Sequence, residues 1–160
     1  MTFESKPSYW LDRTTFSKIV EATPLVSIDL IVCNQEGQVL LGRRLNRPAQ
    51  GYWFVPGGRV RKDEMLADAF WRLTKEELGH HISQSSAHFL GPFEHFYSDN
   101  FSEEEFSTHY VVLGYELPWQ DTLMSLPVAQ HDQYCWFDVE ALLADPLVHQ
   151  HTKDYFIERI

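Results

Sequence analysis

The sequence is poor in cysteine and has no long apolar run, and both absences restrict the class of protein. Its 160 residues include two cysteines, Cys33 and Cys135, each in an apolar segment. Isolated thiols favour free, buried side chains in a reducing compartment over a disulfide framework. No apolar run is long enough to cross a bilayer, and residues 1–9 are too polar for a signal peptide. We therefore expect a soluble, cytoplasmic protein that does not bind membranes.

Basic residues are also scarce. The chain has 13 Lys and Arg against 23 Asp and Glu, a net charge of −10, and it has no Lys or Arg from residue 76 to residue 152. A general nucleic-acid binder needs cations that neutralise phosphates, so we expect no nucleic-acid partner. The basic residues that do occur cluster between positions 43 and 62, where a small anion could bind: Arg43, Arg44, Arg47, Arg59, Arg61 and Lys62. Of these, Arg61 and Lys62 fit a solvated surface better.

The hydrophobic pattern predicts one α+β domain that spans residues 1–160. Apolar residues at helical spacing predict helices over 15–22, 65–78 and 139–144. Apolar or β-branched runs between turn residues predict strands over 25–33, 39–43, 52–55, 87–97, 108–117 and 134–137. Mixed strands with one long central helix favour an α/β/α sandwich around a mixed β-sheet.

The segment from 58 to 79 carries the most specific motif. It resembles the Nudix box, the loop–helix–loop motif of the Nudix hydrolases, at six positions: Gly58, Glu64, Arg72, Glu76, Glu77 and Gly79. On a helix Phe70, Leu73 and Glu77 share one row, so Glu77 should point inward. A buried carboxylate needs a cation, either a metal ion or a basic side chain such as that of Arg72. We expect Glu64 to order the loop and Arg72 to pair with Glu76.

The box departs from its usual pattern immediately after Arg72. Leu73 occupies the position of a glutamate, and Thr74 occupies the position of an aliphatic residue. In Nudix enzymes the missing glutamate helps to bind metal and can activate water. A leucine can do neither, so any general base is expected elsewhere in the chain.

Other segments resemble a subfamily, the GDP-mannose mannosyl hydrolases. They are residues 23–29, 40–44, 46–60, 72–74, 108–114 and 130–132. The resemblance implies hydrolysis of GDP-mannose, and of GDP-glucose, to GDP and free sugar by water attack at the anomeric carbon with inversion. It also implies Mg²⁺, for which Mn²⁺ could substitute, held by the Gly57 carbonyl, Glu77 and Gln130, with His131 as the general base.

The same resemblance implies the residues that bind the substrate. Arg44 and Arg59 would hold the diphosphate, and Tyr110 would donate a hydrogen bond to the leaving group. Asp29 and His95 would lie in or beside the sugar site. The segment 1–22 would contact a partner in a homodimer, with three residues near the nucleotide: Trp10, Leu11 and Phe16.

These roles are chemically consistent, although alternatives remain for single residues. Displacement at an acetal carbon needs the charge of the departing diphosphate neutralised, and a neutral histidine suits water activation. Tyr110 lies in an apolar strand and could simply belong to the core. A buried carboxylate such as Asp29 is harder to dismiss. The remaining histidines of interest are expected at the surface: His80, His81, His149 and His151.

Two other functions fit the sequence. A nucleotide-sugar pyrophosphatase would attack phosphorus, with Glu76 or Glu77 compensating for Leu73. A non-catalytic Nudix module would bind a nucleotide sugar without turnover.

Overall fold

A computed structural model describes residues 10–120 and 131–157 of the chain. The helices are α1 (Arg13–Ala22), α2 (Leu66–Leu78), α3 (Val139–Ala144) and α4 (Gln150–Lys153), with one 3₁₀ turn, η1 (Gln84–Ser86). The strands are β1 (Leu25–Cys33), β2 (Val39–Arg44), β3 (Trp53–Phe54), β4 (Gly57–Arg59), β5 (His88–Tyr97), β6 (Thr108–Pro118) and β7 (His131–Phe137). No helix in the described part of the chain is long and apolar enough to cross a membrane.

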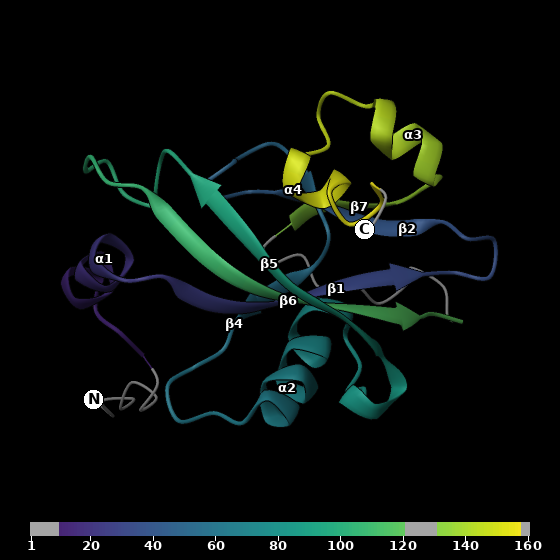
Figure 1. Cartoon of the computed structure of the whole chain (residues 1–160), viewed down its shortest axis with the longest axis horizontal. Helices are drawn as coiled ribbons and strands as arrows, with labels where there is room; N and C mark the ends of the chain where they lie inside the picture. Colours follow the sequence, from purple (N-terminus) through teal and green to yellow (C-terminus); the bar gives the residue numbers. More distant parts are fainter. Residues whose placement is uncertain (1–9, 121–130, 158–160) are drawn as a thin grey trace, which may run out of the picture.

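One mixed sheet organises the molecule, with strand order β3-β2-β1-β6-β5. The central pair β1 and β6 is parallel, and β5 pairs antiparallel with β6. Helix α2 lies on one side of the sheet, and α3 and α4 lie on the other (Figure 1). The predicted α+β sandwich is therefore confirmed.

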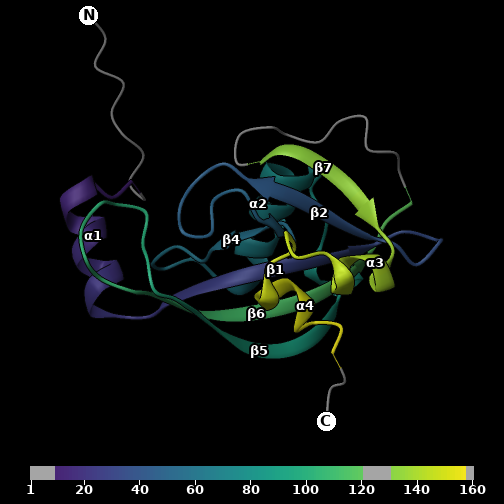
Figure 2. The same cartoon turned by 90° about the horizontal axis from the view of Figure 1, so that it is seen from above.

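Each side of the sheet has its own apolar core. Under α2, Phe70 and Leu73 are buried against the strand residues Ile28 and Leu30. On the opposite side, Leu142 of α3 packs with strand residues and with the C-terminal residues Val148 and Tyr155. Figure 2 shows α1 apart from this body, beside the β5–β6 loop. Both cores meet at β1, whose consecutive buried residues face alternate sides.

The strands β1 and β2 diverge soon after the turn that joins them. Their only ladder pair in the described residues joins Cys33 to Val39. Beyond it, β4 pairs with β1, while β7 pairs with β2. The sheet is thus split between β1 and β2, and residues of both strands border the space at this split.

Several details differ from the sequence-based expectations. The strand β4 and the helix α4 were not predicted, because each is too short to show a period. Cys135 is exposed, which corrects the expectation of a buried thiol, and Cys33 is half-buried; both are free.

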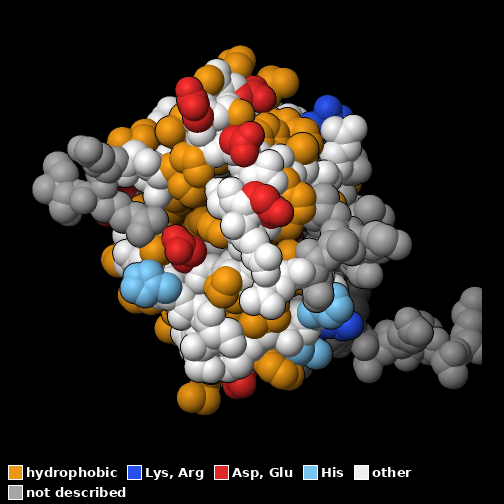
Figure 3. Space-filling view, turned by 90° about the vertical axis from the view of Figure 1, so that its right-hand side faces the viewer, with side chains coloured by type: hydrophobic (Ala, Val, Ile, Leu, Met, Phe, Trp, Pro, Cys, Tyr) orange, Lys and Arg blue, Asp and Glu red, His pale blue; other side chains and the backbone are white. Residues whose placement is uncertain are grey.

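On the face shown in Figure 3, acidic side chains lie among exposed hydrophobic ones, while Lys and Arg appear only at its margins.

Replacement of Leu73 by glutamate tests whether this position belongs to the core. Leu73 is 1% exposed, and its Cδ2 occupies the space that a Cβ on Gly58 would need, at 2.5 Å. We expect Leu73→Glu to lower the free energy of unfolding by about 3 kcal/mol in urea without divalent cations. Leu73→Met, the matched control, should cost less than about 1.5 kcal/mol. A Leu73→Glu variant as stable as wild type would contradict this placement.

Candidate functional site

A pocket lies at the split of the sheet and collects six of the twelve residues predicted to function. It is lined by Ser27, Asp29, Arg44, Asn46, Phe54, Val55, Gly57, Gly58, Arg59, His95, Tyr97 and Tyr110. Strand register explains this gathering: Asp29 lies opposite Gly57, and Tyr110 lies opposite His95. Residues from β1, β2, β4, β5 and β6 therefore share one cavity.

The two glycines of β4 allow this strand to lie close to its neighbours. A Cβ on Gly57 would collide with the Ile28 carbonyl and would lie 2.5 Å from Oδ1 of Asp29. A Cβ on Gly58 would strike Leu73 of α2. The backbone of β4 is thus held between β1 and α2, and its three residues line the pocket.

Asp29 is held from a second direction by Tyr155. The Tyr155 hydroxyl donates a hydrogen bond of 2.6 Å to Oδ2 of Asp29. Burial raises the pKa of the Asp29 carboxyl to about 7, although this bond and the charge of Arg44 oppose the shift. The buried carboxylate expected from the sequence therefore has a partner, as its desolvation requires.

The two arginines predicted to bind the diphosphate flank the pocket from different strands. The guanidinium of Arg44 lies 5.4 Å from the ring centre of Phe54, and that of Arg59 lies 4.3 Å from the ring centre of Phe16. Stacking on aromatic rings orients both planar groups. Burial raises the pKa of the Tyr110 hydroxyl, so it stays protonated and able to donate a hydrogen bond. Tyr110 is thus part of strand β6 and also lines the pocket.

Glu77 points inward at the end of α2, as its helical row predicts. Its side chain is 2% exposed. Burial, together with the nearby charge of Glu76, raises the pKa of Glu77 to about 8, and Arg44 opposes the shift. The basic residues of the same helix are engaged elsewhere, since Arg72 bonds Glu64 and Glu76 while Lys75 bonds the Gly79 carbonyl.

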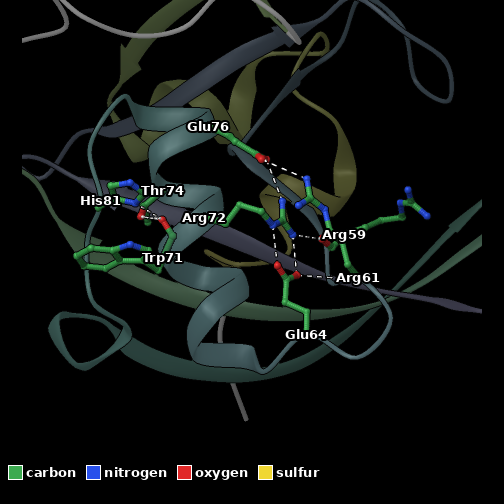
Figure 4. A network of polar contacts seen from close by, with 8 residues as sticks. All are labelled: Arg59, Arg61, Glu64, Trp71, Arg72, Thr74, Glu76 and His81. Carbon is green, nitrogen blue, oxygen red and sulfur yellow. Dashed lines mark hydrogen bonds and ion pairs between the residues drawn. The ribbon is translucent and has the colours of Figure 1, made fainter. Parts of the chain in front are cut away.

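The other charged residues of the box hold the loop that precedes α2 (Figure 4). Arg72 binds both carboxylate oxygens of Glu64, at 2.7 and 2.8 Å, and donates to the Arg59 carbonyl at 2.9 Å. Glu64 also accepts from the backbone N–H of Arg61 at 3.0 Å. Glu76 pairs with Arg72 at 2.9 Å and with Arg61 at 3.4 Å. The expected roles of Glu64 and of the Arg72–Glu76 pair are thereby confirmed.

Two histidines expected at the surface lie beside the pocket instead. The rings of His151 and His95 stack at 4.3 Å with an interplanar angle of 4°, and His149 stacks on Phe54 at 4.7 Å. The expectation was wrong because α4 folds these residues onto the sheet. His81, in contrast, is exposed, although it stacks on Trp71 at 4.7 Å.

The pocket also contains a buried imidazole with hydrogen-bonding capacity. His95 is 4% exposed, and its Nε2 makes no hydrogen bond within the described part of the chain. Burial and the neighbouring His151 and His149 lower the pKa of His95 to about 3. The ring is therefore neutral near pH 7 and contributes one donor and one acceptor.

The remaining predicted residues are not gathered into the pocket. Trp10 and Leu11 are exposed at the start of the described chain. Phe16 does not line the pocket, but its ring packs against the guanidinium of Arg59. Gln130 lies outside the described residues. The backbone of His131 pairs with Arg44 in the β2–β7 ladder, which brings this residue to the arginine side of the split.

Sequence reasoning missed several residues of the pocket wall. Ser27, Asn46, Phe54 and Tyr97 line it, but their side chains carry no motif of their own. Tyr155 was also missed. The sequence indicates that a buried Asp29 needs a hydrogen-bond donor, but it does not show which residue donates.

Glu64→Gln tests the loop network through its dependence on pH. Arg72 lowers the pKa of Glu64 below 4.5, so the ion pair stabilises the fold above that pH, and its contribution is lost as the pH falls through the folded-state pKa. We expect urea unfolding at pH 7 to give the variant a free energy of unfolding about 1–2 kcal/mol below that of wild type. This difference between variant and wild type should shrink in acid. Asp63→Asn, at an exposed pair with Lys62, should change little. An equal loss at pH 7 and pH 3 would contradict the ion pair.

Comparison with known proteins gives the family. The family model of the NUDIX domain matches residues 23–160. The low-salt glycan biosynthesis protein Agl8 of Haloferax volcanii is 42% identical over 133 residues, which are 83% of this chain and 83% of that protein.

Solved structures agree on the fold. A MutT protein from Methanosarcina mazei Go1 superposes with a TM-score of 0.65 at 22% identity, covering 84% of this chain and 92% of that one. The NUDIX domain of Shewanella oneidensis NrtR, complexed with ADP ribose, gives 0.62 at 18% identity, covering 90% and 96%. Since the family model covers most of the chain and a relative of 42% identity spans 83% of it, the chain belongs to the Nudix hydrolase family.

Proposed function

We propose that the protein hydrolyses GDP-mannose, and also GDP-glucose, to GDP and free sugar by water attack on the anomeric carbon. The observation that carries this proposal is the placement of Leu73. The side chain at this box position is buried in the core beneath Gly58 and cannot activate water. Of the two carboxylates that could compensate, Glu76 is engaged by Arg72 and Arg61, and Glu77 is assigned here to the divalent cation. A base on the box helix is therefore disfavoured, and so is the usual attack on phosphorus.

The residues present fit a divalent cation near Gly57 and Glu77. Nudix hydrolases generally use such ions, and Mg²⁺ takes a few oxygen ligands while keeping others for water and phosphate. Among the described residues no group of three or more His, Cys, Asp or Glu could form a metal site. The proposed set needs only one carboxylate, from Glu77, with a carbonyl from Gly57 and the amide oxygen of Gln130. The buried Glu77 carboxylate, whose pKa is raised to about 8, is stabilised by such a charge.

When bound, the cation would neutralise part of the charge of the diphosphate. The chain's own residues supply the other contributions. Arg44 and Arg59 bind the diphosphate oxygens and stabilise charge on the departing GDP. The protonated Tyr110 hydroxyl donates to the leaving oxygen. Asp29 and His95 contact the hydroxyl groups of the sugar.

His131 accepts the proton of the attacking water in this proposal. Its backbone is placed beside Arg44 by the β2–β7 ladder, where β7 begins. A neutral imidazole suits this role at neutral pH. Inversion requires one base on the face of the sugar opposite the leaving GDP.

The relatives support the substrate class. Agl8 is a glycan biosynthesis protein, and the NrtR domain holds ADP ribose, a nucleoside diphosphate joined to a sugar. A diphosphate between a nucleoside and a sugar matches a pocket whose wall carries two arginines together with a carboxylate and a histidine.

We further propose that residues 1–22 contact a second copy of the chain. Trp10 is 58% exposed and Leu11 is 38% exposed, which suits burial against a partner. Phe16 is already packed within its own chain, against Phe101 at 4.8 Å and beneath Arg59. Sedimentation velocity of Trp10→Ala should show a monomer where the wild type is a dimer; an unchanged dimer would exclude a role for Trp10.

Hydrolysis in heavy-oxygen water identifies the atom that is attacked. Attack on the anomeric carbon leaves GDP without label, and the phosphate oxygens of GDP do not exchange with water, so mass spectrometry of GDP gives a stable record. We expect unlabelled GDP and no GMP. Labelled GDP, or GMP with sugar phosphate, would establish attack on phosphorus, while binding without turnover under saturating Mg²⁺ would favour the non-catalytic module.

Replacement of His131 tests the general base. We expect His131→Ala to lower kcat by about 10²- to 10⁴-fold, the usual contribution of a positioned base, with a small change in KM. His81→Ala, at an exposed histidine that follows α2 and stacks on Trp71, is the matched control and should retain full activity. A loss of only a few-fold in His131→Ala would remove His131 from this role.

A further inference from the structure

Tyr155 is a buried residue that lies far along the chain from Asp29, the pocket residue that it contacts. It follows α4 and is 1% exposed, among the apolar residues of the α3 and α4 side. Its hydroxyl reaches Asp29, 126 positions earlier in the chain, at 2.6 Å. A phenol that ends at a carboxylate in the pocket wall is poised to fix where that carboxylate points.

The ring of Tyr155 is itself held in one orientation. Phe93 packs edge to face against it, with ring centres 4.6 Å apart and an angle of 70°. Gly114 leaves room for the ring, since a Cβ there would lie 3.2 Å from Cε1 of Tyr155. The hydroxyl therefore approaches Asp29 from a fixed direction.

Asp29 is enclosed on its other oxygen by Gly57. The space beside Oδ1 is so narrow that a Cβ on Gly57 would lie 2.5 Å away. With Tyr155 on Oδ2 and the β4 backbone beside Oδ1, the carboxylate has little rotational freedom about its Cα–Cβ and Cβ–Cγ bonds.

The segment that carries Tyr155 also supports the second polar group at the same end of the pocket. His151 stacks on His95, and its Nε2 lies 3.0 Å from the Phe96 carbonyl. The ring of Tyr155 meets that of His95 at 6.0 Å and 60°. One short C-terminal segment thus backs both Asp29 and His95, while its contact on the arginine side runs through His149, which stacks on Phe54, the ring that Arg44 lies over.

We propose that Tyr155 is a positioning residue that acts through Asp29 and gives the pocket its preference for a nucleotide sugar over the bare nucleoside diphosphate. This rests on the proposed function, in which Asp29 faces the sugar and the arginines face the diphosphate. Loss of the hydroxyl leaves the diphosphate end intact and frees Asp29 to rotate. Binding of the sugar should therefore weaken, while binding of the nucleotide should stay unchanged.

Calorimetric titration of GDP-mannose and GDP measures this preference as the ratio of the two dissociation constants. Ca²⁺ replaces Mg²⁺, and product analysis verifies that no substrate is consumed. In Tyr155→Phe we expect the preference for GDP-mannose to fall about tenfold, the size of one hydrogen bond to a charged group, with GDP binding unchanged.

Tyr115→Phe is the matched control. Tyr115 is similarly buried on the α2 side of the sheet, and its hydroxyl accepts a bond of 2.6 Å from Gln84. It should keep the wild-type preference, although the two variants lose comparable stability. In an Asp29→Ala background, Tyr155→Phe should cause no further change, because the group through which it acts is gone.

Three outcomes would overturn the inference. They are a wild-type preference in Tyr155→Phe, an equal loss for GDP and GDP-mannose, and additive effects of the Tyr155 and Asp29 changes. A wild-type protein that binds GDP-mannose no better than GDP would overturn the proposed sugar site along with it. If the wild type discriminates and Tyr155→Phe also discriminates, only the role of Tyr155 fails.

Discussion

The close approach of β4 to its two neighbours is the constraint on which the site depends. Gly57 lies against Asp29 of β1, and Gly58 lies against Leu73 of α2, so neither position has room for a side chain. This double contact fixes β4, whose three residues line the pocket, between β1 and the box helix. The split between β1 and β2 then opens the cavity beside it.

The charged residues of the box divide between structure and chemistry. Arg72, Glu64 and Glu76 form a network that ties the loop to the helix. Glu77 alone turns into the interior, where burial and neighbouring carboxylates make its charged form costly. A chain of net charge −10 thereby concentrates a small positive region at Arg44 and Arg59, which suits an anionic ligand.

Local sequence patterns predicted the elements with a clear period and missed those that depend on tertiary contacts. The 3.6-residue spacing of Phe70, Leu73 and Glu77 predicted both α2 and the inward direction of Glu77. The three-residue β4 exists only because β1 accepts it, and α4 is a single turn. No pattern in the sequence links Tyr155 to Asp29, because their contact arises from folding the C-terminal segment across the sheet.

The same distinction applies to the site. The resemblance to the subfamily pointed to Asp29, Arg44, Arg59, His95 and Tyr110, which the strand registers bring to one pocket. The histidines of α4 were assigned to the surface, because a lone histidine in a polar segment carries no sign of what will cover it. Their stacking on His95 and Phe54 is a consequence of packing alone.

In the proposed reaction, water attacks the sugar carbon from the face opposite the diphosphate. Proton NMR of GDP-mannose turnover, recorded faster than free mannose equilibrates between its anomers, tests this claim most directly. Because the mannosyl group of GDP-mannose is α-linked, the account predicts that β-mannose appears first and that the α-anomer follows by mutarotation. Initial release of α-mannose, or accumulation of mannose 1-phosphate, would contradict it.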